Sequence, residues 1–175
     1  MILIVNVCKE KLHYYEFIKP IEEILKKNEI KFVTKHYKDI SKSDLKECEK
    51  IIICGTSLRD NQFLNDLDKF DWITIETKQI LGICAGMQII GLHCGGKLKN
   101  KAEIGYYTES FKNFLGLNGD HEVYHLHNNY IEFKDNFAVL GYGDIVQAVK
   151  YRNLYGVLFH PEVRNKDLIV NFCNL

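Results

Sequence analysis

The chain has 175 residues, enough for one well-buried domain and too few for two. Lysine plus arginine equals aspartate plus glutamate at 23 each, so the net charge indicates neither a nucleic acid nor an anionic membrane surface as a partner. The N-terminal apolar run is too short for a signal peptide, and no stretch is long enough to span a membrane. We therefore expect a cytoplasmic protein with one domain over residues 1–175.

Six cysteines are scattered through the chain. Because the chain is long enough to build an ample core, it does not need disulfide bonds in the way that a small secreted domain does. We expect all of them to be free thiols: Cys8, Cys48, Cys54, Cys84, Cys94 and Cys173.

The first half of the chain alternates strands and helices. Residues 1–8 form a continuous apolar run of strand length, which is typical of a strand covered on both faces. A helix is predicted over residues 14–30, with Pro20 near its first turn. The remaining elements predicted here are strands at 31–37, 50–56 and 79–84, a short helix around 44–48, and a helix at 71–77, although the last segment also alternates like a strand.

The second half is richer in strands. Short β-like segments cover residues 104–110, 122–128, 130–133, 138–143, 145–151 and 154–160, and an amphipathic helix at 166–175 ends the sequence. No repeat or linker divides the chain. This order predicts a single α/β domain with a mainly parallel central sheet flanked by helices, followed by a strand-rich second half.

One cysteine lies between two glycines where an apolar strand ends and a helix begins. Gly82 and Gly86 flank Cys84 as in a nucleophile elbow, a tight turn that exposes the nucleophile at the carboxyl end of a parallel strand. The positive end of a helix dipole would favour the thiolate. A buried cysteine that only packs beside two glycines remains the alternative.

A base for this thiol is available near the C-terminus. The segment "YGVLFHPEV" delivers His160 at the end of a predicted strand, and Glu162 follows two residues later. Pro161 favours an extended conformation at His160, in which residues two apart point the same way. Cys84, His160 and Glu162 can then act as nucleophile, base and orienting carboxylate.

The segments "GICAGMQ" and "YGVLFHPEV" together resemble the class I glutamine amidotransferases. This resemblance spans most of the chain and implies a flavodoxin-like fold with a Cys84–His160–Glu162 triad. It also implies that the side-chain amide of glutamine is hydrolysed through a thioester on Cys84, and that the ammonia passes to a synthetase or synthase partner. We expect no cofactor, no nucleic acid and no membrane partner.

Substrate-binding residues follow from the same resemblance. The backbone N–H of Ala85 and the loop at Gly55 and Thr56 are candidates for the oxyanion hole, and Gln88 matches the family glutamine that contacts substrate. Many relatives have a second glycine where this chain has Thr56. A β-branched residue there is unfavourable if the position needs a positive φ.

Relatives of the GMP synthetase type often have a Ser-His-x-Asp segment, and "HLHNNYIEF" places His127 and Asn129 at its histidine and aspartate. These two residues are candidates for contact with a partner or substrate. "KAEIGYYT" weakly resembles a Glu-x-Gly segment of the same relatives. The group His121, His125 and His127 suggests a metal, but no carboxylate or cysteine lies at ligand spacing, so we predict no metal site.

Three functions remain open. The first is a glutaminase that supplies ammonia to a separate synthetase, most plausibly of the GMP synthetase type, and the absence of an ATP-binding glycine loop favours it. The second is a stand-alone hydrolase of γ-glutamyl compounds with the same triad. The third is a non-catalytic binding module that retains the motif residues.

Overall fold

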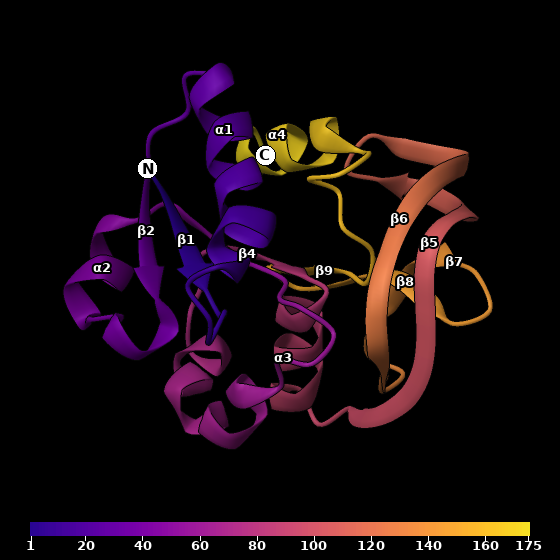
Figure 1. Cartoon of the computed structure of the whole chain (residues 1–175), viewed down its shortest axis with the longest axis horizontal. Helices are drawn as coiled ribbons and strands as arrows, with labels where there is room; N and C mark the ends of the chain where they lie inside the picture. Colours follow the sequence, from indigo (N-terminus) through magenta and orange to yellow (C-terminus); the bar gives the residue numbers. More distant parts are fainter.

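The computed structural model describes all 175 residues, and its strands form one nine-stranded sheet (Figure 1). The strand order is β2-β1-β3-β4-β9-β8-β7-β5-β6. The strands are β1 (Ile2–Asn6), β2 (Phe32–His36), β3 (Lys50–Ile53), β4 (Gln79–Ile83), β5 (Lys97–Phe114), β6 (Leu117–Glu132), β7 (Ala138–Tyr142), β8 (Val146–Tyr151) and β9 (Leu154–Val157). Each predicted strand overlaps one of these, and the separate predictions at 122–128 and 130–133 belong to one continuous strand, β6.

The parallel part of the sheet runs from β2 to β9. Neighbouring strands in the order β2-β1-β3-β4-β9 all pair in parallel. The side chains of β1 and β3 are buried on both faces, as their continuous apolar runs predict. The carboxyl ends of these strands therefore meet at one edge, where ligands bind in open α/β sheets.

Four α-helices accompany the sheet. They are α1 (Lys19–Lys27), α2 (Lys42–Glu47), α3 (Ala85–His93) and α4 (Lys166–Cys173). A π-helical turn (Tyr14–Ile18) precedes α1, and Pro20 lies in the first two positions of α1, as predicted. A 3₁₀ segment (Gln62–Thr74) precedes β4, so the helical prediction for 71–77 is confirmed for its first four residues. None of the helices combines the length and the apolar character that crossing a membrane requires.

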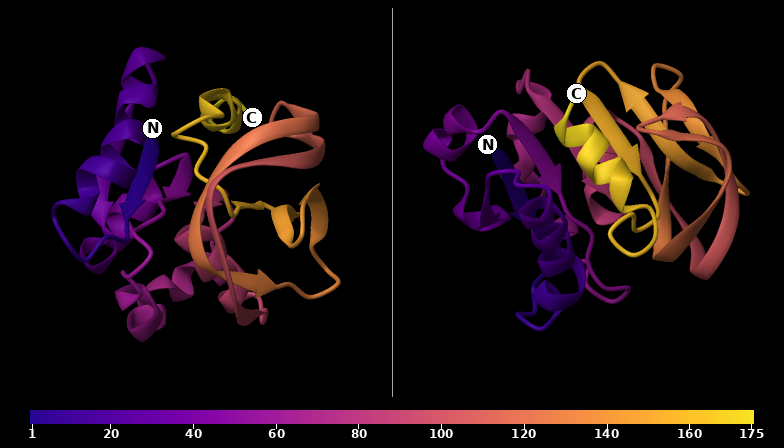
Figure 2. Two further views of the ribbon diagram at one scale, coloured as in Figure 1. Left: turned by 45° about the vertical axis from the view of Figure 1, so that its right-hand side comes forward. Right: turned by 90° about the horizontal axis from the view of Figure 1, so that it is seen from above.

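Helices cover both faces of the parallel strands (Figures 1 and 2). Ile21 of α1 and Leu168 of α4 belong to one buried apolar cluster, which includes Ile4 of β1. Ile90 of α3 belongs to the other cluster, which includes the neighbouring Leu3. Successive residues of a strand thus face different layers, and the predicted α/β architecture is confirmed.

The strand-rich second half extends the same sheet with antiparallel strands. β9, β8, β7, β5 and β6 pair antiparallel in that order. β5 and β6 form a long curved hairpin at the edge of the molecule (Figure 2). The middle of β6 reaches the carboxyl-end edge of the parallel strands, where the carbonyl of Tyr124 accepts a hydrogen bond from the His160 N–H at 2.8 Å. The hairpin therefore forms one wall of the site described next.

Candidate active site

Cys84 lies on a strained turn between β4 and α3. Its φ of 49° and ψ of −102° fall outside the regions that side chains usually adopt, and such a conformation costs about 1–3 kcal/mol. The two flanking glycines allow the turn. A Cβ at Gly82 would lie 2.5 Å from the Gly86 carbonyl carbon, and one at Gly86 would lie 2.2 Å from the Ile53 oxygen. The predicted elbow is therefore present.

His160 and Glu162 form a buried pair. Nδ1 of His160 lies 2.7 Å from Oε1 of Glu162, and the two residues are 1% and 3% exposed. A neutral imidazole in this arrangement donates Nδ1–H to the carboxylate, which leaves Nε2 as the nitrogen that can take a proton. The pair can therefore supply and orient a base.

The route by which the two side chains meet differs from the prediction. β9 ends at Val157, three residues before His160, so His160 is not at the end of a strand. The Val163 N–H donates to the His160 carbonyl at 3.2 Å, which closes a turn with Pro161 at its second position. A turn over Pro161 and Glu162, and not a continuous extended segment, brings the imidazole and the carboxylate together.

Gly55 marks the place where the cysteine and the histidine approach each other. A Cβ at this position would lie 2.6 Å from Cε1 of His160 and 3.3 Å from Cβ of Cys84. Both side chains therefore flank the same glycine. Burial lowers the pKa of His160, but the Glu162 carboxylate and the Cys84 sulfur raise it, and the net pKa lies well above 6.5.

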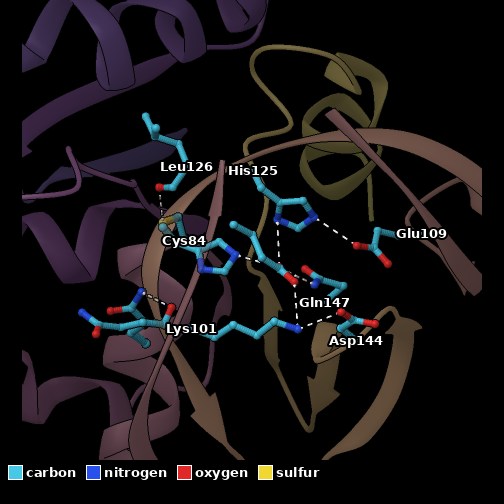
Figure 3. Close-up of polar contacts among 11 residues, drawn as sticks. Cys84, Lys101, Glu109, His125, Leu126, Asp144 and Gln147 are labelled. Carbon is cyan, nitrogen blue, oxygen red and sulfur yellow. Dashed lines mark hydrogen bonds and ion pairs between the residues drawn. The ribbon is translucent and has the colours of Figure 1, made fainter. Parts of the chain in front are cut away.

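The Cys84 thiol has a further polar neighbour on β6. Sγ donates to the carbonyl of Leu126 at 3.7 Å (Figure 3). Nε2 of His160 is buried and has no hydrogen-bond partner. Attack of the sulfur on an amide requires a base to take the thiol proton, and Nε2 is the His160 nitrogen that is free to do so.

The loop after β3 supplies backbone donors beside Cys84. The N–H groups of Gly55 and Thr56 have no backbone acceptor, and neither has that of Ala85 at the start of α3. Thr56 is not among the residues with positive φ. Its hydroxyl donates to Oδ2 of Asp60 at 2.8 Å. The loop is thus held by a side-chain contact and does not need the left-handed backbone that would disfavour threonine.

A narrow pocket lies over Cys84. Its lining includes Thr56, Ala85, Gln88, His127 and Asn129, so it brings together predicted residues from separate segments of the chain. Nε2 of Gln88 donates to the backbone carbonyl of Asn129 at 3.2 Å.

The pocket is closed in this structure. It offers about 20 Å³ of space to water, which is room for about one molecule. The side chain of Asn128, on β6, donates to the Leu58 carbonyl at 3.2 Å and links the two walls. A glutamine side chain can reach Cys84 only if these walls separate. A larger cavity, of about 740 Å³, lies beside Cys94 and Asn153 and contains none of the predicted site residues.

A buried polar cluster lies beside this pocket, and sequence reasoning missed most of it. Glu103 pairs with His127 across β5 and β6, and Glu103 Oε2 lies 3.1 Å from His127 Nε2. Our statement that no carboxylate lies at ligand spacing from the histidines is therefore wrong. The Glu-x-Gly segment contained the signal, but the strand register that turns Glu103 toward His127 was needed to read it.

Comparisons with known proteins agree with this geometry. The family model described as glutamine amidotransferase class-I matches residues 13–170. A GMP synthase of Staphylococcus epidermidis is 38% identical over 107 residues, which are 53% of this chain and 21% of that protein. A glutamine-hydrolysing GMP synthase subunit of Picrophilus torridus is 34% identical over 100 residues, covering 50% of this chain and 53% of that one.

Two longer matches complete these comparisons. Imidazole glycerol phosphate synthase subunit HisH of Leptospira borgpetersenii is 29% identical over 191 aligned positions, covering 85% of this chain and 92% of that one. The solved structure of a Thermoplasma acidophilum protein, described as a candidate subunit of GMP synthase, has a TM-score of 0.87 at 24% identity and covers 99% of this chain and 92% of that one. The similarity to this structure shows that the two chains share a fold.

The chain spans about a fifth of the length of the full GMP synthase from Staphylococcus, with 21% of that protein aligned. The family model, in contrast, covers nearly all of this chain and includes the elbow and the buried histidine–glutamate pair. The protein belongs to the class I glutamine amidotransferase family.

Proposed function

We propose that residues 1–175 form a glutaminase domain in which Cys84, His160 and Glu162 hydrolyse the side-chain amide of glutamine. The observation that carries the proposal is the buried 2.7 Å contact between His160 and Glu162, next to a cysteine held on a strained elbow. A nucleophile, a base and a group that orients the base are the parts that acyl transfer requires.

The reaction proceeds in two stages. The Cys84 sulfur, its proton taken by His160, attacks the amide carbon, and the imidazolium returns that proton to the nitrogen as the C–N bond breaks and ammonia leaves. A γ-glutamyl thioester remains on Cys84. His160 then takes a proton from water, the water oxygen attacks the thioester carbon, and glutamate and the thiol are released.

Backbone donors stabilise the negative oxygen in both stages. The N–H groups of Gly55, Thr56 and Ala85 are the candidates, because they lie beside Cys84 and have no backbone acceptor. Losing one such donor costs about 100-fold to 1000-fold in rate. Gln88, which lines the same pocket, is proposed to contact the amino acid part of the substrate.

The ammonia acceptor is proposed to belong to a separate synthetase of the GMP synthase type. Two GMP synthase relatives and the fold of the Thermoplasma protein support this choice, whereas the HisH match supports an imidazole glycerol phosphate synthase partner instead. The closed pocket favours a glutaminase that depends on a partner, because an outside contact at the Leu58–Asn128 link could open it. His127 and Asn129 lie close to this link.

The experiment is to incubate the protein with glutamine and measure glutamate, alone and with each candidate partner protein. We expect weak release alone and strong release with a GMP synthase that lacks its own glutaminase domain. Cys84→Ala abolishes release while keeping the fold. Vigorous partner-independent hydrolysis of other γ-glutamyl compounds would favour a stand-alone hydrolase, and no release under any pairing would favour a non-catalytic module.

A further inference from the structure

A cluster of buried polar side chains fills the space between β5, β6 and β8, next to the active site but outside the proposed triad (Figure 3). Glu103, His125 and His127 are its centre, and they are 3%, 0% and 2% exposed. Gln147 and Glu109 adjoin them. None of these five residues is needed for the chemistry proposed above, so their burial requires another explanation.

The strand geometry brings the central three together. His125 and His127 are two residues apart on β6 and share one face of the strand. Glu103 is the cross-strand neighbour of His127, directly after an irregularity in the β5 register. One nitrogen or oxygen atom from each of the three lies within 4.8 Å of the others.

The nitrogens of the two imidazoles turn toward a common oxygen. Oε2 of Glu103 lies 3.1 Å from Nε2 of His127 and 3.8 Å from Nδ1 of His125. The other nitrogen of His125, Nε2, lies 3.2 Å from Oε1 of Glu109. If Nε2–H donates to Glu109, then Nδ1 of the neutral ring presents a lone pair to Glu103.

Several atoms in the cluster have no partner. Nδ1 of His125 and Oε1 of Gln147 are buried and make no hydrogen bond. Leaving a buried polar atom unpaired costs about 1–3 kcal/mol, and a lone pair that faces a carboxylate adds repulsion. A positive group at this point would remove both costs.

One positively charged side chain lies beside the cluster. Lys101 is the nearby cation, with Nζ 3.4 Å from Oε1 of Glu103, but it also pairs with Asp144 at 3.0 Å.

We propose that Glu103, His125 and His127 bind a divalent transition-metal cation, with Zn²⁺ as the best match. Two imidazole nitrogens and one carboxylate oxygen are a common zinc donor set. In a tetrahedral site with Zn–N bonds of about 2.0–2.1 Å, ligand atoms are about 3.3 Å apart, which lies between the 3.1 and 3.8 Å separations found here. Water or the amide oxygen of Gln147 is available as a fourth ligand.

Outer contacts fit the same assignment. Oε1 of Glu109 lies 3.2 Å from the His125 nitrogen that faces away from Glu103, and Nε2 of Gln147 donates to Oε2 of Glu103 at 3.1 Å. Partners of this kind fix the ring orientation of metal-binding histidines and usually accompany such sites.

The cation would act on the structure of the pocket. Leu126 lies between the two histidines, and its carbonyl accepts the Cys84 thiol at 3.7 Å (Figure 3). Cross-linking His125 and His127 to β5 therefore fixes the part of β6 that faces the nucleophile. None of the three ligands contacts the reacting atoms, so the role is structural positioning.

Direct binding of Zn²⁺ and Co²⁺ to chelator-treated protein tests the proposal. A Cys84→Ser background removes the active-site thiol as a competing ligand. We expect about one equivalent of Zn²⁺ by calorimetry, a rise in Tm with zinc, and visible Co²⁺ absorption without the charge-transfer band of a thiolate.

Variants locate the site. Glu103→Gln keeps the shape of the side chain and removes its charge. This variant and a separate His125→Asn variant should each weaken zinc binding by about 100-fold or more. His121→Asn, a histidine substitution on the same strand outside the cluster, should leave binding unchanged. Circular dichroism checks that each variant is folded.

Three results would overturn the proposal: no zinc or cobalt binding by the wild-type chain, undiminished binding in folded Glu103→Gln protein, or a Co²⁺ spectrum dominated by thiolate. The wild-type titration and spectrum decide the question even if the His125 variant fails to fold.

Discussion

Nδ1 of His160 lies 2.7 Å from Oε1 of Glu162 in a place where both side chains are almost completely buried. A buried carboxylate that accepts from an imidazole fixes the tautomer of the ring and stabilises its charged form. We therefore expect the contact between His160 and Glu162 to control both the rate of glutamine hydrolysis and the pH dependence of the free energy of unfolding.

Replacing the carboxylate tests the first of these roles. Glu162→Gln should lower kcat for glutamine hydrolysis by about 100-fold or more, because the amide can reverse the tautomer of His160. KM should change little, since Glu162 does not line the pocket. Glu122→Gln, at an exposed pair with Arg164, is the matched control. A loss of less than about fivefold in Glu162→Gln would remove Glu162 from the triad.

The pH dependence of stability tests the second role. The folded-state pKa of His160 lies well above 6.5, so the native state holds this proton more tightly than the unfolded chain does. Its contribution to the free energy of unfolding is complete below about pH 6.5 and is lost as the pH rises through the folded-state pKa.

Urea unfolding between about pH 6 and about pH 9 measures this effect. The difference in free energy of unfolding between wild type and Glu162→Gln should be largest at the acidic end and should shrink as the pH rises. A difference that grows with pH would show that His160 is neutral when folded.

Two glycine substitutions should have different effects. In Gly55→Ala the new Cβ meets Cε1 of the His160 side chain at 2.6 Å, so the imidazole must turn and activity should fall about 100-fold or more. In Gly86→Ala the Cβ meets the Ile53 backbone oxygen at 2.2 Å, which cannot move easily. That variant should lose stability by about 1–3 kcal/mol or more.

Thermal unfolding and glutamate release, measured on both variants, separate these outcomes. Gly55→Ala is expected to lose less stability than Gly86→Ala, because its Cβ meets the end of a side chain and not a backbone atom. A fully active Gly55→Ala protein would show that the imidazole does not occupy this place during the reaction.

The Asn128 side chain bridges the pocket to the Leu58 carbonyl at 3.2 Å. Asn128→Ala removes this link and should raise partner-independent glutaminase activity several-fold, because a hydrogen bond of this kind contributes about 1 kcal/mol. Steady-state release of glutamate without any partner is the measurement. Asn118→Ala, at the far end of β6, serves as control, and equal rates in the two variants would exclude the link as a gate.

Much of the fold follows from local pattern. Apolar runs of strand length predict β1, β3 and β4, and the glycines around Cys84 predict the elbow, because both features depend on residues that are neighbours in the chain. The partnership of His160 and Glu162 could also be predicted, although the turn at Pro161 creates it in place of the extended segment that we expected.

The features that could not be predicted depend on contacts between distant segments. Glu103 meets His127 only through the β5–β6 register, which a bulge after Asn100 shifts. The Thr56 loop depends on Asp60, and closure of the pocket depends on Asn128. Spacing along the chain does not determine any of these contacts, since one residue of slippage between strands reverses every side chain.

The central claim is that Cys84 is a nucleophile activated by His160. Burial raises the pKa of the other five thiols, so they should react slowly. The most direct measurement is mass spectrometry of the protein after incubation with a diazoketone analogue of glutamine. A single adduct on Cys84, formed much more slowly in His160→Asn, is the predicted result. No adduct at Cys84 in folded wild-type protein, even with the partner synthetase present, would contradict the account.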